Sequence, residues 1–252
     1  AVRDLEVDRY EIDGRPQQVL VAARELNSEG IPNRTWVSRH LLYTHGCGVI
    51  AAPASRTTVD GRPVYVDLGV SRPELYFGEG IDSYALVNTE QVEQPCVGST
   101  STESTTGGVQ LSSALRRAAY AIQYSEYNLF GSGLVNSQSR IIHDRNVTAR
   151  VERLAPFLRY DADPYPVVVN GTVQWVLDAY TISDRYPYAQ QANIDQLSPG
   201  GGLNTSFNYV RNSVKAVVDA FTGDVTFYIV DANDPIVASW SKAFPDLFTD
   251  VS

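Results

Sequence analysis

The first part of the chain alternates apolar and polar residues with the period of a β-strand. The alternation runs through residues 5–12, and Asp13-Gly14 then supplies a tight turn before an apolar return segment at residues 18–23. Because neighbouring side chains of a strand point to opposite faces, this pattern predicts two antiparallel strands with one buried face. We therefore expect residues 1–97 to be rich in strands.

Two other local signals fall within this region. Trp36, His40 and Tyr43 recur at helical spacing after a capping residue, which predicts a short helix at about residues 35–42. Asp60-Gly61 separates two short apolar segments and predicts a second hairpin.

The composition changes after this strand-rich region. Residues 98–108 are rich in Ser, Thr and Gly and contain no residue typical of a core. We predict an exposed, mobile loop.

Helical periodicity follows over residues 109–158. One set of apolar residues recurs with helical spacing, so we expect it to line one face of a helix: Leu111, Leu115, Ala118, Ala119 and Ile122. Val147, Val151 and Leu154 have similar spacing and precede Pro156, which predicts a second helix that ends there.

The last third, residues 159–252, returns to strand patterns. Asn170-Gly171 between two apolar runs is the clearest hairpin signal in the chain, and the turn at residues 222–224 predicts another. Asp234-Pro235 predicts the start of a final short helix. Strands on both sides of a helical segment predict an α+β fold, with antiparallel hairpins and meanders around a central helical block, formed by residues 1–252 as one domain.

The composition is typical of a globular protein. Hydrophobic residues make up 43% and charged residues 19% of the 252 residues, enough for a core and too little charge for a disordered chain. With a net charge of −9, the chain lacks the basic surface that a nucleic-acid partner requires. No apolar run approaches the roughly 18 residues that cross a bilayer, so we expect this portion to be soluble. The lack of methionine leads us to expect a processed or excised piece of a longer protein.

Cys47 and Cys96 are the only two cysteines. Neither lies in a CxxC motif of the kind that redox or zinc sites use. Outside the cytoplasm, the pair would close a loop of about 50 residues and stabilise the fold by about 4 kcal/mol in the chain-entropy model. In a reducing compartment, both are expected to be inert buried thiols. The sequence leaves both alternatives open.

Several reactive residues have ordinary structural explanations. His45 lies close to Cys47, but sequence neighbours rarely give a thiol and a base the geometry that catalysis needs. Ser213 and Lys215 would lie on one face of a strand, where a hydrogen-bonded structural role is the simpler explanation. The three histidines do not have the spacing of zinc ligands.

Two groups of oxygen-bearing side chains are candidates for a calcium site: the first is Asp161, Asp163 and Asp178, and the second is Asp231, Asn233 and Asp234. Calcium prefers about six to eight oxygen ligands, which loop carboxylates supply together with backbone carbonyls. Turn and helix-cap chemistry is the simpler explanation of both groups, and neither matches the EF-hand loop. Calcium is the only cofactor that the sequence suggests.

Several longer segments are unusual enough to identify a family. They are Trp36-Val37-Ser38-Arg39-His40-Leu41-Leu42-Tyr43-Thr44-His45-Gly46, Tyr76-Phe77-Gly78-Glu79, Ala155-Pro156-Phe157-Leu158, Asp161-Ala162-Asp163-Pro164-Tyr165, WVLDAYTIS at residues 175–183, Tyr186-Pro187-Tyr188, NYVRNSVKA at residues 208–216 and Asp234-Pro235-Ile236. Together these segments resemble uncharacterised protein family 0182, which comprises large bacterial membrane proteins with several N-terminal transmembrane helices and a long extracytoplasmic portion. The resemblance runs from about Asp8 to Phe248.

The resemblance implies that the chain is an extracytoplasmic domain of a protein anchored in the bacterial cell membrane. Transmembrane helices would precede Ala1, and further soluble sequence would follow Ser252. The family has no assigned activity, so the resemblance implies none. The chain departs from the family in having Cys47 where an aromatic residue is usual, and the Ser/Thr tract from Gly98 replaces a more ordered segment. These departures fit a disulfide with Cys96 that is particular to this member.

We expect a non-enzymatic module for interaction, assembly or envelope transport, because the resemblance places the chain in the cell envelope and no convergent catalytic set is visible. The expected partners are its own transmembrane segment and other envelope proteins, with no nucleic acid and an unknown small-molecule ligand. One alternative is a cell-envelope hydrolase that uses carboxylates such as Asp161 or Asp178. Another alternative is a calcium-stabilised structural domain.

Overall fold

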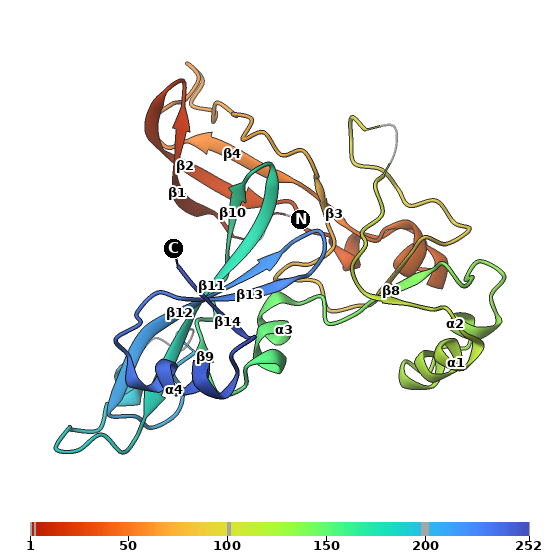
Figure 1. Cartoon of the computed structure of the whole chain (residues 1–252). Coiled ribbons are helices and arrows are strands. Elements are labelled where there is room, and N and C mark those ends of the chain that lie inside the picture. Colours follow the sequence, from red (N-terminus) through yellow and green to blue (C-terminus); the bar gives the residue numbers. More distant parts are fainter. Residues whose placement is uncertain (1, 3, 100–101, 198–201, 252) are drawn as a thin grey trace. The chain divides into compact units, whose positions relative to one another are not determined.

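The computed structural model describes residues 2, 4–99, 102–197 and 202–251 and divides into two compact units (Figure 1). Unit 1 consists of Ala1–Asn146, Val168–Val173 and Ala220–Gly223, and unit 2 consists of Val147–Val167, Gln174–Asp219 and Asp224–Ser252. Whether residues 1–252 fold as a single domain stays a prediction.

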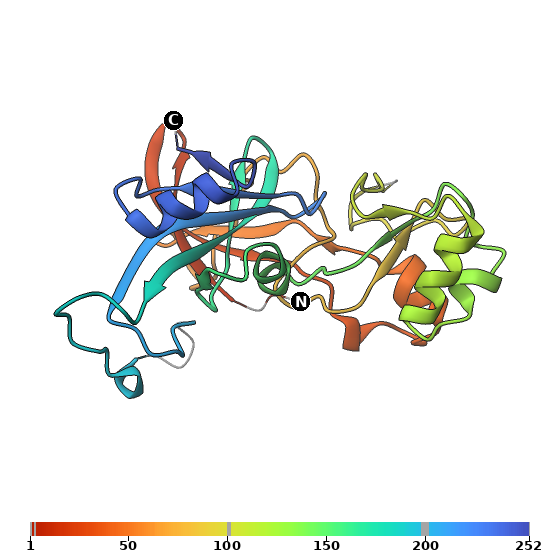
Figure 2. The same ribbon diagram turned by 60° about the horizontal axis from the view of Figure 1, so that its bottom comes forward.

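Unit 1 contains small antiparallel sheets and two short α-helices. Strands β1, β2 and β4 form one sheet, β6, β8 and β7 form a second, and β3 pairs with β5. Helices α1 and α2 lie beside each other (Figure 2) and pack around an apolar cluster with the second sheet. The bounds are β1 Glu6–Ile12, β2 Arg15–Ala23, 3-10 helix η1 Ser28–Gly30, π-helix η2 Ser38–Leu42, β3 Gly46–Cys47, β4 Val49–Pro53, β5 Glu74–Leu75, β6 Ala85–Val87, β7 Val109–Gln110, α1 Ala114–Gln123, α2 Asn128–Gly131 and β8 Arg140–Ile142.

Unit 2 is built on a sheet with the strand order β10-β11-β12-β13-β14, in which β9 also pairs with β11. Strand β14 runs parallel to β13, and β11 is antiparallel to β12. Buried side chains alternate with partly exposed ones along β11, so this strand presents one face to the core. The bounds are α3 Val147–Leu154, β9 Arg159–Tyr160, β10 Tyr165–Val169, β11 Thr172–Ser183, 3-10 helix η3 Ile194–Gln196, β12 Tyr209–Asp219, β13 Val225–Ile229, α4 Pro235–Ala243 and β14 Phe248–Asp250.

Two of the hairpins predicted at Gly-containing turns are present as regular hairpins. Strands β1 and β2 are joined at Asp13-Gly14, and β10 and β11 are joined at Asn170-Gly171. Asn170 and Gly171 have φ values of 51° and 77°, the left-handed pair that a two-residue hairpin turn requires. Around Asp60-Gly61, by contrast, only an isolated bridge forms, so the hairpin predicted there is not a regular one.

The structure contains both helices and several antiparallel sheets, which confirms this part of the α+β prediction. The prediction of a central helical block was wrong. Within residues 109–158, α1 and α2 belong to unit 1 and α3 begins unit 2. Strand β8 lies between α2 and α3 in the sequence and pairs with both β6 and β7. Ile141 and Ile142 are fully buried in this strand, and β-branched residues favour that environment over a helix.

The loop predicted at residues 98–108 lies partly outside the described residues, at positions 100 and 101. Thr105 is fully buried and its hydroxyl donates a 2.6 Å hydrogen bond to the carbonyl of Phe221, whereas the neighbouring Thr106 is exposed. A Cβ atom added at Gly107 would lie 2.2 Å from the carbonyl oxygen of Thr222. The small residues here therefore allow close packing of the backbone, which their composition alone does not reveal.

Among the described residues, none of the helices combines the length and the apolar character that a membrane span requires.

Candidate functional site

Helix α1 packs against the core of unit 1 through one side. The hydroxyl of Ser113 accepts a 3.2 Å hydrogen bond from the backbone N–H of Arg116 and caps the start of the helix. Tyr120, Ala121 and Tyr124 then pack against the buried cluster. These residues recur at helical spacing, so they define the core-facing side of α1.

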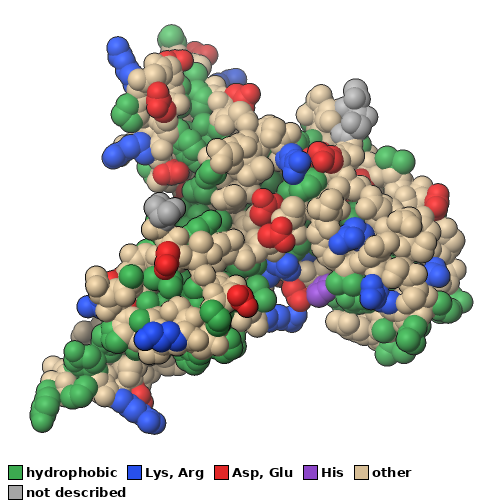
Figure 3. All heavy atoms as spheres, viewed as in Figure 1, with side chains coloured by type: hydrophobic (Ala, Val, Ile, Leu, Met, Phe, Trp, Pro, Cys, Tyr) green, Lys and Arg blue, Asp and Glu red, His purple; other side chains and the backbone are tan. Residues whose placement is uncertain are grey.

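The opposite side of α1 is also apolar but faces solvent. The side chains of Leu115 and Ile122 are 82% and 79% exposed. At about 100° per residue, these two positions lie nearly opposite Tyr124 on the helix. With Ala118 and Ala119 between them, they form what we call the α1 apolar face. Figure 3 shows apolar side chains gathered over the part of unit 1 where Figure 1 labels α1.

The apolar face predicted for this helix therefore lies on its solvent side rather than in the core. Of its members only Leu111 is fully buried, and it lies before the helix begins. The larger rings of Tyr120 and Tyr124 occupy the core side instead, because aromatic side chains bury more apolar area than Leu or Ile. Next to α1, Tyr127 and Phe130 are 76% and 46% exposed and add further apolar surface.

Unit 1 also contains a buried network of polar and charged side chains. The carboxylate of Glu93 is buried and accepts hydrogen bonds from the hydroxyls of Thr44, Ser104 and Tyr76, the last at 2.8 Å. Burial, followed by the neighbouring Glu93 charge, raises the pKa of Tyr76 well above its ordinary value. The hydroxyl of Tyr76 therefore remains a hydrogen-bond donor at any physiological pH.

Arg145 belongs to the same network and is the largest fully buried side chain among the described residues. Its guanidinium donates to the backbone carbonyls of Tyr76 at 2.7 Å, Ser83 at 3.2 Å and Thr44. Burial lowers the pKa of Arg145 to about 10, which still leaves it protonated at neutral pH. One buried cation thus ties together three separate segments of unit 1.

A second buried carboxylate, Glu25, binds the backbone of the Tyr76-Phe77-Gly78-Glu79 motif. It accepts hydrogen bonds from the backbone N–H groups of Glu79 and, at 3.0 Å, Gly80. A Cβ atom at Gly78 would lie 2.1 Å from the Glu25 carboxylate. The glycine in this motif is therefore explained by the close approach of a buried carboxylate.

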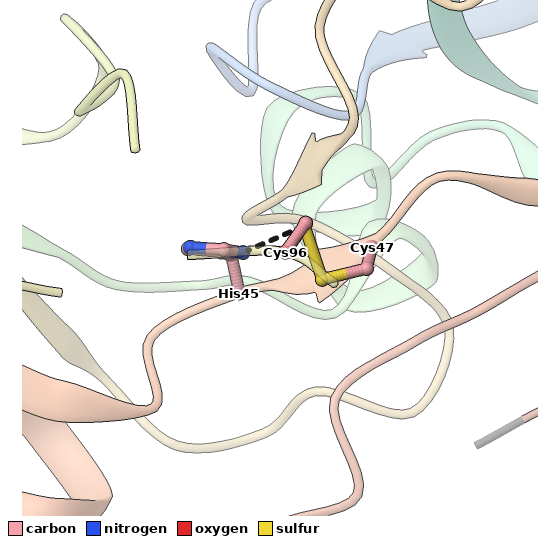
Figure 4. Close-up of side chains that lie close together, drawn as sticks. All are labelled: His45, Cys47 and Cys96. Carbon is pink, nitrogen blue, oxygen red and sulfur yellow. Dashed lines mark hydrogen bonds between the residues drawn. A yellow bond between two sulfur atoms is a disulfide. The ribbon is translucent and has the colours of Figure 1, made fainter. Parts of the chain in front are cut away.

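Cys47 and Cys96 are joined by a disulfide in the structure, with their Cα atoms 5.5 Å apart (Figure 4). The bond connects β3 to the segment that carries Glu93. His45 lies beside it, with Nδ1 3.9 Å from the sulfur of Cys96 and 2.8 Å from the carbonyl oxygen of Gly46. Within the described part of the chain, Nε2 of this buried ring has no hydrogen-bond partner.

In unit 2, Asp234 is fully buried as the N-cap of α4. Its carboxylate accepts hydrogen bonds from the hydroxyls of Thr181, Ser213 at 2.7 Å and Tyr209 at 2.7 Å, and from the N–H of Ile236 at 3.0 Å. Burial alone raises the pKa of this carboxyl, but the hydrogen bonds outweigh burial and lower it below its ordinary value. Asp234 therefore holds α4 against the sheet rather than presenting free oxygens.

A bulge in β12 separates this buried site from a partly exposed one. The register of β11 and β12 shifts at Ser213, which places its hydroxyl on the core side. The next polar residue, Lys215, pairs with Asp178 on the opposite side, where Asn212 also donates to Asp178 at 2.8 Å. Burial lowers the pKa of Lys215. The Ser213–Lys215 pair therefore serves two different carboxylates and is not a catalytic dyad.

The remaining predicted calcium ligands are also engaged separately. Asp161 accepts hydrogen bonds from the N–H of Asp163 at 3.2 Å and from the hydroxyl of Tyr180 at 3.1 Å. Asp231 forms a 2.6 Å ion pair with Arg211 and accepts a 3.0 Å hydrogen bond from the N–H of Asn233. Across the described residues, no three carboxylates place ligand atoms within 4.8 Å of one another. Calcium at either group stays a prediction.

Sequence reasoning missed Glu93 and Arg145 altogether. A single sequence contains no signal that distinguishes a buried charge from the many solvated ones, because the partners of Arg145 are backbone carbonyls rather than a spaced set of side chains. The exposed side of α1 was visible as an apolar pattern, but the pattern did not indicate that solvent rather than the core faced it.

The geometry defines an α+β module with a buried polar network and an exposed apolar helix face. The chain belongs to the uncharacterised protein family UPF0182, whose model matches residues 1–252. It is similar to UPF0182 proteins of Pelotomaculum thermopropionicum (41% identity, covering 98% of this chain and 28% of the relative) and Trichodesmium erythraeum (39% identity, 99% and 30%). A relative from Methanospirillum hungatei is 42% identical and is covered over 29% of its length. The chain thus spans less than a third of the relatives it matches, and no solved structure matches it.

Proposed function

We propose that this chain is a non-enzymatic interaction and assembly module of a larger bacterial membrane protein, located on the extracytoplasmic side of the cell membrane. Its α1 apolar face binds an apolar segment of the same parent polypeptide outside residues 1–252. The observation that carries this proposal is the exposure of Leu115 and Ile122 on the side of α1 opposite the core.

The cost of leaving such a face in water supports a partner. Burial of a Leu or Ile side chain is worth roughly 1.5–3 kcal/mol, and contiguous exposed apolar patches mark interaction sites. The core already occupies the Tyr120 and Tyr124 side of the helix, so the opposite stripe contributes nothing to the fold of this chain. The length of the relatives supports a partner within the same polypeptide, because the matched region covers only 28–30% of each of the three relatives named above.

The test compares the isolated chain with the full-length parent protein after the substitutions Leu115→Glu and Ile122→Glu are combined. In the isolated chain, both side chains are already solvated, so we expect the melting temperature to change by less than about 2 °C. In the parent protein, the loss of two buried side chains weakens docking by about 4 kcal/mol and raises the population of the undocked domain up to about a thousandfold. Limited proteolysis then releases the domain at least tenfold faster.

Gln123→Glu is the control for the introduction of a carboxylate, because it adds one negative charge, against two in the double variant, at an exposed polar position of the same helix. This variant leaves the proteolysis rate of the parent protein unchanged. Equal proteolysis rates for the double variant and the unsubstituted parent contradict the proposal.

A cell-envelope hydrolase is the second candidate. The observation in its favour is the surface group of Asp178, Lys215 and Asn212, in which burial lowers the pKa of the lysine. Its test is hydrolysis of labelled envelope glycans or peptides by the purified chain, with loss of turnover in Asp178→Asn. Absence of turnover with every such substrate at high protein concentration removes this candidate.

A further inference from the structure

The Cys47–Cys96 pair has a third metal-ligating side chain beside it (Figure 4). The ligand atoms of His45, Cys47 and Cys96 all lie within 4.8 Å of one another, and in the described residues no second set of three His, Cys, Asp or Glu side chains does so. In a tetrahedral site, zinc–sulfur bonds of about 2.3 Å and zinc–nitrogen bonds of about 2.0 Å place the ligand atoms roughly 3.5–3.8 Å apart. The 3.9 Å separation between Nδ1 of His45 and the sulfur of Cys96 is close to that value.

We propose that reduction of the disulfide converts this place into a binding site for a thiophilic cation, with Zn²⁺ as the ion of the right chemistry. The ligands are the two sulfurs of Cys47 and Cys96 and Nδ1 of His45. This inference does not rest on the interaction function proposed above and has its own test.

The hydrogen bonding of His45 supports Nδ1 as the ligand atom. In the disulfide form, Nδ1–H donates to the carbonyl of Gly46, which leaves Nε2 as a buried acceptor without a donor among the described residues. Transfer of the ring proton to Nε2 costs no hydrogen bond at Nε2, because none exists there. Nδ1 then carries the lone pair that a metal requires. A turn of the ring from the carbonyl of Gly46 toward the sulfur of Cys96, 3.9 Å away, replaces the hydrogen bond to Gly46 with a bond to the metal.

The ligand set and its burial select the ion. Thiolate and imidazole ligands favour zinc, whereas calcium and magnesium require oxygen ligands. Cys96 is 6% and His45 is 7% exposed, so a net charge at this place would be costly. Two thiolates and one divalent cation sum to zero charge. Three protein ligands also leave a fourth position open for water.

The chemistry requires a reductant, for which a dithiol is the natural class. Two electrons pass from the dithiol to the Cys47–Cys96 bond, the S–S bond breaks, each cysteine sulfur takes up a proton, and the reductant becomes a disulfide. Zn²⁺ then displaces the two thiol protons to solvent and forms two zinc–sulfur bonds and one bond to Nδ1. The site therefore binds metal in the reduced form only.

The experiment reduces the purified chain with a dithiol, removes the reductant without oxygen, and titrates Co²⁺ as a spectroscopic probe before displacing it with Zn²⁺. We expect thiolate-to-cobalt charge-transfer bands that saturate at one equivalent in the reduced chain and are missing in the oxidised chain. Cys96→Ser abolishes the bands. His45→Phe retains the ring contact with Tyr76 and weakens binding at least tenfold, whereas the control His143→Phe binds as the unsubstituted chain does.

Near-UV circular dichroism of the reduced, metal-free chain covers the possibility that reduction unfolds it. If the signal is lost and one equivalent of Zn²⁺ restores it, the proposal is supported; if Zn²⁺ fails to restore it, the proposal is wrong. A reduced and folded chain without charge-transfer bands, or binding that His45→Phe leaves unchanged, also overturns it.

Discussion

Replacement of the buried Arg145 by methionine is the sharpest test of how unit 1 is held together. Arg145→Met keeps a side chain of similar length and apolar character, but it removes every donor that reaches the carbonyls of Thr44, Tyr76 and Ser83. It also removes the cation whose field acts on the buried Glu93 and Glu25 carboxylates. We expect a large loss of stability and no loss of packing volume.

The magnitude follows from two opposing terms. Three hydrogen bonds from a charged donor contribute about 2 kcal/mol each, or about 6 kcal/mol together. Burial lowers the pKa of Arg145 from 12.5 to about 10, and at 1.36 kcal/mol per pKa unit this corresponds to a cost of about 3 kcal/mol. The difference is about 3 kcal/mol, at the lower end of the range of roughly 3–5 kcal/mol known for breaking a buried charged interaction. For a chain of this size, the melting temperature falls by about 6–12 °C.

Urea unfolding followed by circular dichroism measures this loss, and Arg56→Met is the control. Arg56 is about half exposed and lies 3.7 Å from the exposed Asp13, so its replacement changes the free energy of unfolding by no more than about 0.5 kcal/mol. Arg145→Lys keeps the charge but not the planar fork of donors, and we expect an intermediate loss. If Arg145→Met costs less than about 1 kcal/mol, the buried network does not stabilise unit 1 as described.

Three further predictions follow from the disulfide, the N-cap of α4 and the calcium candidates. Reduction of the Cys47–Cys96 bond in metal-free buffer changes the mobility of the chain on a gel, and unchanged mobility would show that the bond is absent. Reduction also lowers the free energy of unfolding by about 4 kcal/mol, because the bond closes a loop with a sequence separation of 49 residues. Asp234→Asn destabilises the chain by about 3 kcal/mol at neutral pH. The folded-state pKa of Asp234 lies below its unfolded value, so its contribution to stability is complete above about pH 4 and is lost as the pH falls through the folded pKa. The free energies of unfolding of the unsubstituted chain and of Asp234→Asn therefore converge in acid. A difference between them that does not depend on pH contradicts this. Millimolar Ca²⁺ shifts the melting temperature by less than about 1 °C, because the carboxylates of Asp178 and Asp231 already pair with basic side chains. A clear upward shift that a chelator reverses supports a calcium site instead.

Local turn and strand chemistry could be predicted from the sequence because it depends on neighbours. Asn170-Gly171 specifies a tight turn wherever it occurs between two apolar runs, and Asp234-Pro235 specifies a helix start through a side-chain cap and a fixed φ. These elements are present where the pattern placed them. The family, likewise, was accessible through long segments of specific sequence.

The direction in which a side chain faces could not be predicted, because it depends on residues far away in the chain. Helix α1 has two apolar stripes, and only the tertiary structure decides that Tyr120 and Tyr124 enter the core while Leu115 and Ile122 stay in water. Thr105 is buried through a hydrogen bond to Phe221, 116 residues away. Burial of this kind follows from long-range packing, which the composition of a segment does not reveal.

The central claim is that the α1 apolar face binds another segment of the parent protein. Maleimide labelling of Leu115→Cys tests it most directly, because the native cysteines are held in a disulfide and the new thiol reports solvent access at the face itself. Asp60→Cys, at an exposed turn of the same unit, is the control and labels equally fast in the isolated chain and in the full-length parent. We predict that Leu115→Cys labels at least tenfold more slowly in the parent protein than in the isolated chain; equal rates would show that the face stays in water and would contradict the account.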